Sequence, residues 1–151
     1  MLRTRLSDSL KVAMKARDER SVSALRLILA GLKDRDIAAR TKGAGDGIPD
    51  DEILQMMQNM VRQRRDSIAL YEQGGRPELA EKEASEIAII ESFLPRQLSE
   101  SELGEAVAAL IAELGAASIK DMGRVMAALK ERFAGRLDFA KAGAVVKSKL
   151  S

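Results

Sequence analysis

Apolar residues recur every three or four positions through most of this chain, and that spacing places them on one face of an α-helix. The first stripe predicts an amphipathic helix over residues 2–17, built on Leu2, Leu6, Leu10 and Met14. Asp18 is a suitable cap for a second helix over 19–41. Pro49, followed by three acidic residues, marks the start of a third helix over 49–73 that a pair of glycines ends.

The second half of the chain repeats this pattern in shorter segments. Helices are expected over about 78–93, 100–114 and 138–150. Ser118 begins a further helix, whose apolar stripe runs to Phe133 and which a glycine at position 135 ends. The total is about seven helices, and no segment has the alternating pattern of a strand.

Pro95 divides the chain, because proline cannot continue a helix and restricts the residue before it. Residues 95–98 are therefore the expected domain boundary. The sequence predicts an all-α protein, with an N-terminal α-helical domain of antiparallel hairpins over 1–95 and a small three-helix domain over 96–151.

Composition excludes several classes of chemistry. The chain of 151 residues has no Cys and no His, and aromatic residues make up 3% of it. Disulfides, thiol catalysis and the commonest general base and metal ligand are therefore absent. No apolar run reaches the roughly 18 residues of a membrane span, and the N-terminus is too polar for a signal peptide. We expect a cytoplasmic protein with no metal, cofactor or membrane partner.

The net charge of +2 conceals an uneven distribution of charge. Residues 1–47 contain 11 Lys and Arg against six Asp and Glu, a net charge of +5. Residues 48–115 carry a net charge of −8, and residues 116–151 again carry +5. Such a division indicates either a patch that binds an acidic partner or a set of solvated helix faces.

Three local features have both a structural and a functional interpretation. The glycine-rich segment 43–47 is expected to be a loop and not a phosphate cradle, because no Gly-Lys-Ser/Thr follows it and no strand precedes it. The glutamates along 78–91 are expected to be solvated and not to bind a metal. Arg64 falls within an apolar stripe, where it would extend to solvent or pair with a carboxylate.

Four motifs in a fixed order give the chain a resemblance to YqeY-like proteins of the GatB/YqeY family. Each motif is weak alone, and the ordered set is specific: Gln63-Arg-Arg-Asp-Ser67, Ala80-Glu-Lys-Glu83, Phe93-Leu-Pro-Arg-Gln-Leu-Ser99 and Ile119-Lys-Asp-Met-Gly-Arg-Val-Met126. The resemblance covers essentially the whole chain and implies an all-α, two-domain fold. The part from Leu98 onward is similar to the tail domain of the B subunit of the glutamine-dependent tRNA amidotransferase, which helps to hold the tRNA body.

The first functional hypothesis is a non-catalytic accessory protein, related to tRNA amidotransferases, that binds tRNA electrostatically in translation. The resemblance and the +5 segment together place the tRNA-binding residues in the C-terminal helices: Lys120, Arg124, Lys130, Arg132, Arg136, Lys141 and Lys147. Lys120 and Arg124 are expected on the helix face opposite the apolar stripe. With so few aromatic side chains, base stacking is a poor mechanism, so binding is expected to be salt-sensitive and to follow shape.

Two alternatives remain. One is a protein–protein adaptor for an aminoacyl-tRNA synthetase or an amidotransferase. The other is the activity with which the resembling family is labelled, a carbon–nitrogen ligase with glutamine as amido-N-donor. No catalytic constellation is visible, because the serines at 99, 101 and 118 all stand at helix starts, where capping explains them. We expect no catalytic residue and no enzyme activity of the chain on its own.

Overall fold

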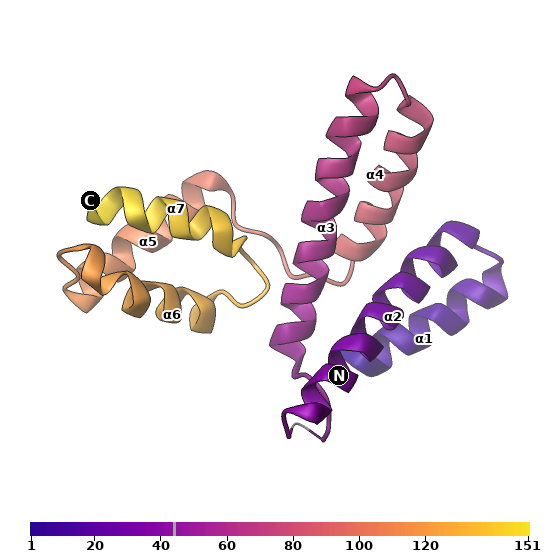
Figure 1. The fold of residues 1–151 in the computed structure, drawn as a ribbon, viewed down its shortest axis with the longest axis horizontal. Coiled ribbons are helices and arrows are strands. Elements are labelled where there is room, and N and C mark those ends of the chain that lie inside the picture. Colours follow the sequence, from indigo (N-terminus) through magenta and orange to yellow (C-terminus); the bar gives the residue numbers. More distant parts are fainter. Residues whose placement is uncertain (44) are drawn as a thin grey trace. The chain divides into compact units, whose positions relative to one another are not determined.

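The computed structural model describes residues 1–43 and 45–151, and these fold into seven α-helices and one 3₁₀ turn (Figure 1). No strand occurs in this part of the chain, so the predicted all-α fold class is confirmed. The helices are α1 (Leu2–Ala16), α2 (Glu19–Thr41), α3 (Asp50–Gln73), α4 (Pro77–Glu91), α5 (Glu100–Leu114), α6 (Met122–Arg132) and α7 (Phe139–Leu150). The predicted loop at 43–47 includes residue 44, which lies outside the described residues.

The chain divides into two compact units, Met1–Leu94 and Pro95–Ser151. Each unit has its own apolar core, and the two cores share no residue. The division into folding domains at 95/96 stays a prediction, because two compact units need not fold independently.

The N-terminal unit consists of two antiparallel hairpins, in which α1 lies beside α2 and α3 beside α4 (Figure 1). Helix α2 also contacts both α3 and α4, so it joins the hairpins. Its inward face buries Leu25, Ile28 and Leu32 in the core. The core is aliphatic and methionine-rich, and Phe93 is its one aromatic member among the buried residues described.

Local sequence signals explain where several of the helices begin. The Asp18 carboxylate accepts the backbone N–H of Ser21 at 3.2 Å and so caps α2. Pro77 is the first residue of α4, where its missing N–H costs nothing. Ser99 and Glu102 form a reciprocal capping box at the start of α5, in which each side chain accepts the other residue's backbone N–H. These are the signals that the sequence contained.

A latch built on Arg3 fixes the N-terminus against the segment before α3. The Arg3 guanidinium binds both carboxylate oxygens of Asp36, and its Nη2 also donates to the Ile48 carbonyl at 2.6 Å. The backbone N–H of Ile48 returns to Asp36 Oδ1 at 3.0 Å. Gly47 has a φ of +86°, and a Cβ there would meet Asp36 and lie 2.7 Å from Arg3 Nη2, so the latch requires glycine.

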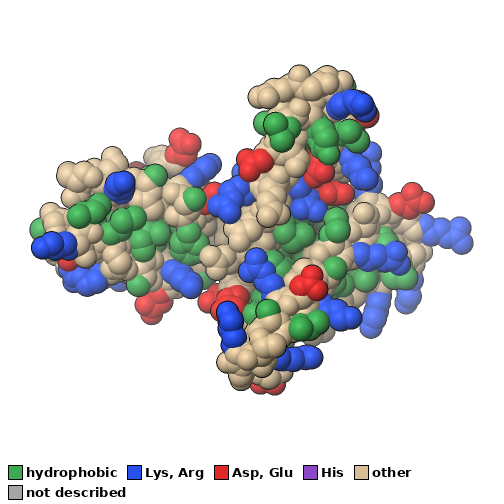
Figure 2. Space-filling model, viewed as in Figure 1, with side chains coloured by type: hydrophobic (Ala, Val, Ile, Leu, Met, Phe, Trp, Pro, Cys, Tyr) green, Lys and Arg blue, Asp and Glu red, His purple; other side chains and the backbone are tan. Residues whose placement is uncertain are grey.

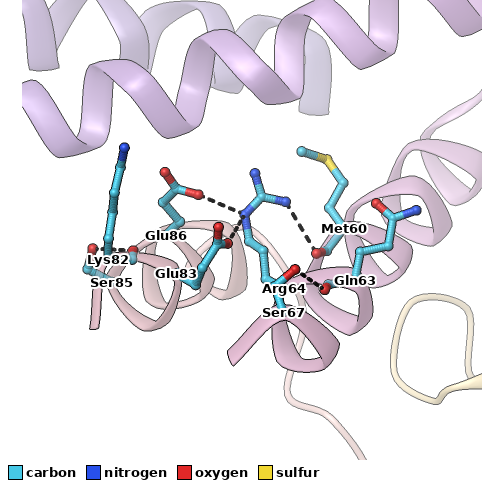
Figure 3. Close-up of polar contacts among 8 residues, drawn as sticks. All are labelled: Met60, Gln63, Arg64, Ser67, Lys82, Glu83, Ser85 and Glu86. Carbon is cyan, nitrogen blue, oxygen red and sulfur yellow. Dashed lines mark hydrogen bonds and ion pairs between the residues drawn. The ribbon is translucent and has the colours of Figure 1, made fainter. Parts of the chain in front are cut away.

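The Arg64 side chain lies between α3 and α4, where it pairs with carboxylates (Figure 3). Of the two interpretations of Arg64 from the sequence, extension to solvent or pairing with a carboxylate, the structure therefore shows the second. The Arg64 Nε is 3.0 Å from Glu86 Oε2 and 3.7 Å from Glu83 Oε2, while Nη1 donates to the Met60 carbonyl at 3.3 Å. Glu86 is the one buried charged residue among those described. Arg64 on α3 therefore supplies the cation that compensates the buried carboxylate of Glu86 on α4.

The C-terminal unit packs α5, α6 and α7 around a core that includes Val107, Leu110, Val125, Leu129 and Val146. The helix expected to begin at Ser118 opens instead with a 3₁₀ turn over Ile119–Asp121. The Asp121 N–H closes this turn by donating to the Ser118 carbonyl at 2.9 Å, and the Asp121 carboxylate accepts the backbone N–H of Ala117 at 2.9 Å. No helix in the described part of the chain is long and apolar enough to cross a bilayer.

Candidate nucleic-acid interface

The seven predicted tRNA-binding residues all lie in the C-terminal unit, but the structure divides them into two groups. The three arginines at 124, 132 and 136 have partners inside the unit. The four lysines at 120, 130, 141 and 147 are exposed, and no ion pair to them occurs among the described residues. Arg132 is paired with an acid that is distant in the sequence, so the sequence pattern did not show this pair, whereas Arg124 and Asp121 are three residues apart.

Arg132 on α6 is bound by Glu113 on α5. Two parallel hydrogen bonds join the guanidinium to the carboxylate, from Nη1 to Oε2 at 2.7 Å and from Nη2 to Oε1 at 2.5 Å. The hydrogen bonds to Arg132 lower the pKa of Glu113, and those to Glu113 raise the pKa of Arg132. Much of the charge of Arg132 is therefore already matched by a carboxylate of the same unit.

The Arg124 side chain forms hydrogen bonds with the turn that precedes its own helix and with the end of α5. Its Nη2 donates to Asp121 Oδ1 at 3.0 Å, and its Nη1 reaches the Leu114 carbonyl at 3.4 Å. The backbone N–H of Ala117 and the Arg124 side chain together lower the pKa of Asp121. Arg124 is thus turned towards the end of α5 and the 3₁₀ turn, and the expectation that it shares a free face with Lys120 stays a prediction.

Arg136 ties the segment after α6 to the segment before α5. Its Nε donates to the Arg96 carbonyl at 3.0 Å, and its guanidinium lies over the Phe133 ring at 5.8 Å from the centroid. The Leu98 N–H returns to the Arg136 carbonyl at 2.8 Å. Arg136 is half-buried and its position is fixed, although no carboxylate neutralises it among the described residues.

The lysines are spread over the polar surface of the unit. On α7, Lys141 and Lys147 are six residues apart and therefore point about 120° from each other around the helix. Lys149, which the sequence prediction omitted from the site, is also exposed and stands on the same helix. An arrangement of this kind suits diffuse contact with a polyanion better than a convergent pocket for one small anion.

Ser99, one of the three serines expected at helix starts, is the N-cap of α5. Ser99 Oγ accepts the N–H of Glu102 at 3.1 Å, as a capping residue does. Its Oγ makes no hydrogen bond to a lysine or to a carboxylate among the described residues. Within the same residues, no group of three or more acidic side chains is arranged to hold a metal ion.

The N-terminal unit contains a groove that the sequence did not reveal. It has a volume of about 920 Å³ and lies along one face of α1, with the start of α2 and the end of α4 completing it. The lining is mostly small or apolar and includes Val12, Ala13, Ala16, Ile89 and Phe93. Val12 is 66% exposed, so part of this apolar lining is open to solvent.

Comparison with known proteins assigns the family. The family model described as Yqey-like protein matches residues 3–150, nearly the whole chain. The chain belongs to the YqeY-like protein family. The resemblance drawn from the four motifs is thereby confirmed at the level of the family.

Relatives of this YqeY-like chain carry the name "Altered inheritance of mitochondria protein 41, mitochondrial". The protein from Lachancea thermotolerans is 32% identical over 111 residues, which cover 72% of this chain and 57% of that protein. The protein from Saccharomyces cerevisiae is 33% identical over 98 residues, which cover 65% and 51%. The protein from Kluyveromyces lactis is 32% identical over 88 residues, which cover 58% and 45%. The chain spans about half the length of the curated relatives it matches.

The names of these relatives overturn one expectation. The prediction of a cytoplasmic protein is wrong by this comparison, because the relatives are named as mitochondrial proteins. The prediction rested on a polar N-terminus and the lack of a long apolar run, and neither property distinguishes cytoplasm from an organelle interior.

Proposed function

We propose that this YqeY-like protein is a non-catalytic accessory protein that binds tRNA through the exposed lysines of its C-terminal unit. The observation that supports the proposal most directly is the division of the cations in α6, α7 and the turn before them. The three arginines form hydrogen bonds or ion pairs within the unit. The lysines are exposed and form no ion pair with an acidic side chain among the described residues: Lys120, Lys130, Lys141, Lys147 and Lys149. Because this unit resembles a tail domain that holds tRNA, we propose tRNA as the polyanion that these lysines bind.

The proposed mechanism is the replacement of counterions along the phosphates. Each lysine that contacts a phosphate releases a condensed cation, so the affinity falls steeply as the salt concentration rises. Lysine suits this task because its ammonium group is a compact charge on a flexible stem and needs no fixed geometry. Because the relatives are named as mitochondrial proteins, we propose that this role is carried out in mitochondria.

A salt titration of tRNA binding, followed by fluorescence anisotropy, tests the proposal. The variant K120Q/K130Q/K141Q/K147Q/K149Q should lower the slope of log affinity against log salt by about 3 or more, at roughly 0.7 to 0.9 for each phosphate that is no longer neutralised. The matched control is E113Q/R132Q, which removes an internally paired cation together with its acid and leaves the net charge unchanged. Its slope should equal that of the wild type. Binding that is independent of salt, or no binding at low salt, would contradict the proposal.

The groove on the N-terminal unit favours a second candidate function, that of a protein–protein adaptor. We propose an amphipathic helix with an acidic flank as its occupant, because Arg5 of the lining together with Lys11 and Lys15 beside it on α1 outnumber the two lining carboxylates, Asp8 and Asp18. The apolar face of such a helix would cover Val12, which is otherwise mostly exposed. The adaptor partner in this proposal is an aminoacyl-tRNA synthetase or an amidotransferase.

Titration calorimetry of the full chain against an acidic amphipathic peptide tests the adaptor. The wild type should bind, Val12→Glu should lose most of the affinity, and Val12→Leu should retain it. Equal binding by all three proteins, or none by the wild type, would remove the groove as a docking site.

A further inference from the structure

Helix α2 carries a row of cations on the face turned away from the core. Arg26, Lys33 and Arg40 are spaced seven residues apart, which is close to two helical turns, so they lie one above another. Successive members of the row are about 10 Å apart along the helix axis, from a rise of about 1.5 Å per residue. All three side chains are exposed. Figure 2 shows Lys and Arg side chains along the part of the molecule that α1 and α2 form.

The fold makes little use of this row, although the charge of Arg40, after the hydrogen bond from Arg3, helps to lower the pKa of Asp36. No ion pair or hydrogen bond to the side chain of Arg26, Lys33 or Arg40 occurs within residues 1–43 and 45–151. The nearest candidate partner of Arg40 is Asp36, one turn before it. Both oxygens of that carboxylate are taken by Arg3, and Oδ1 also accepts the Ile48 N–H. The latch at the N-terminus therefore leaves the charge of the row available to an external anion.

The residues beside the row indicate which kind of anion it fits. Leu27 and Ile37 are about half exposed on this side of α2, which by itself would suggest a docked protein helix. Asp34 interrupts them, because it lies between them on the helix surface and is exposed. A protein helix packed over Leu27 and Ile37 would bury the Asp34 carboxylate without a partner, at a considerable cost. A polyanion that touches the cation row alone leaves Asp34 in water.

We propose that the row Arg26–Lys33–Arg40 is a second phosphate-binding surface, through which the N-terminal unit contacts the backbone of the same tRNA. This proposal rests on the proposed function and extends it to a part of the chain that no resemblance to a tRNA-holding tail covers. Two weak electrostatic surfaces on one chain reinforce each other, because binding at one raises the effective concentration of tRNA at the other. The contact is made to phosphates and does not read sequence.

The test uses the full chain and bulk tRNA in the same salt titration. The variant R26Q/K33Q/R40Q should lower the salt slope by about 2 and weaken binding at about 0.1 M salt by about a hundredfold, since three phosphates are no longer neutralised. The matched control is R65Q/R76Q/R96Q, which also removes three positive charges. Each of those arginines is paired with a glutamate of its own unit. The control should change the slope by less than about 1.

The outcomes separate this inference from the proposed function. A reduced slope for the α2 variant with a nearly unchanged control supports the second surface. An α2 variant that binds as the wild type does, while the five-lysine variant loses binding, overturns the second surface and leaves the C-terminal site intact. Equal losses in the α2 variant and its control overturn the inference too, because net charge alone would then explain them. No tRNA binding by the wild type at low salt overturns both proposals.

Discussion

Arginine and lysine behave differently at the residue scale in the C-terminal unit. Arg132 presents a planar fork to the Glu113 carboxylate, whereas Arg124 donates to Asp121 through Nη2 alone, and each of these bonds is 3.0 Å or shorter. Lys130 is on the same helix and has no such partner among the described residues. Arg26 and Arg40 of α2 are exposed and also have no such partner among the described residues, so the residue type alone does not decide whether a surface cation is paired.

Glu102 shows how one exposed carboxylate can make stability depend on pH. Its two oxygens accept hydrogen bonds from the Arg96 guanidinium at 2.9 Å, and Oε1 accepts the Ser99 N–H at 3.0 Å. These bonds, the one from Arg96 first, lower the pKa of Glu102 from 4.5 to about 2. Because the folded-state pKa lies below the unfolded one, this contribution is complete above about pH 4.5 and is lost as the pH falls towards 2.

We therefore predict a pH-dependent effect of Glu102→Gln. The variant should be less stable than the wild type at about pH 6, and the difference should shrink steadily between about pH 4.5 and 3, measured by urea unfolding. Glu105→Gln on the same helix is the control, because Glu105 is exposed and has no ion pair among the described residues. A difference for Glu102→Gln that stays constant with pH would contradict this assignment.

At the scale of elements, the α3–α4 hairpin depends on a buried charge. Glu86 is 7% exposed, and Arg64 is the cation that faces it at 3.0 Å. A buried carboxylate that loses its cation retains the full cost of leaving water. The neighbouring pair of Arg65 with Glu91 has the same residue types, but both side chains are well exposed, and such pairs contribute little.

Arg64→Met should destabilise the protein by about 3 kcal/mol, whereas Arg65→Met should change stability by less than about 1 kcal/mol. The double variant R64M/E86M should recover most of the loss, because an apolar pair of similar size replaces the buried ion pair. Urea unfolding followed by circular dichroism measures all three. Equal effects of Arg64→Met and Arg65→Met would show that the Arg64 contact is not a buried pair in solution.

At the scale of the whole molecule, two separate cores predict two separable unfolding events. The core of the C-terminal unit contains residues such as Leu110, Val125 and Leu129, none of which packs in the N-terminal core. A unit of this size is expected to be marginally stable alone, by about 3 kcal/mol.

A fragment of residues 95–151 should therefore be helical and unfold cooperatively in urea at a low midpoint. Leu129→Ala in this fragment should abolish the transition, since a buried leucine contributes about 2 to 5 kcal/mol. The same substitution in the full chain should leave the N-terminal unit folded. A fragment without helical signal would show that the two units fold as one domain.

The sequence determined most of the element positions in this protein. Apolar stripes such as Leu2–Leu6–Leu10 are local signals, and so are the residues that mark helix starts, Asp18, Pro77 and Ser99. Each acts within a few residues, so the sequence shows it without knowledge of the fold. The exception is the 3₁₀ turn at Ile119–Asp121, where the Asp121 carboxylate accepts the backbone N–H of Ala117, a contact that a periodicity cannot show. The four ordered motifs also identified the family, since their order is a property of the sequence alone.

The tertiary structure alone decided which charges are free. Arg132 and Glu113 are 19 residues apart, Arg64 and Glu86 are 22 apart, and Arg3 and Asp36 are 33 apart. Whether such groups meet depends on how helices pack, and the free energy of each pair depends on burial, which the sequence does not give. The count of +5 in residues 116–151 therefore indicated a basic segment, while the fold distinguished paired arginines from exposed lysines and set the cation row of α2 on an open face.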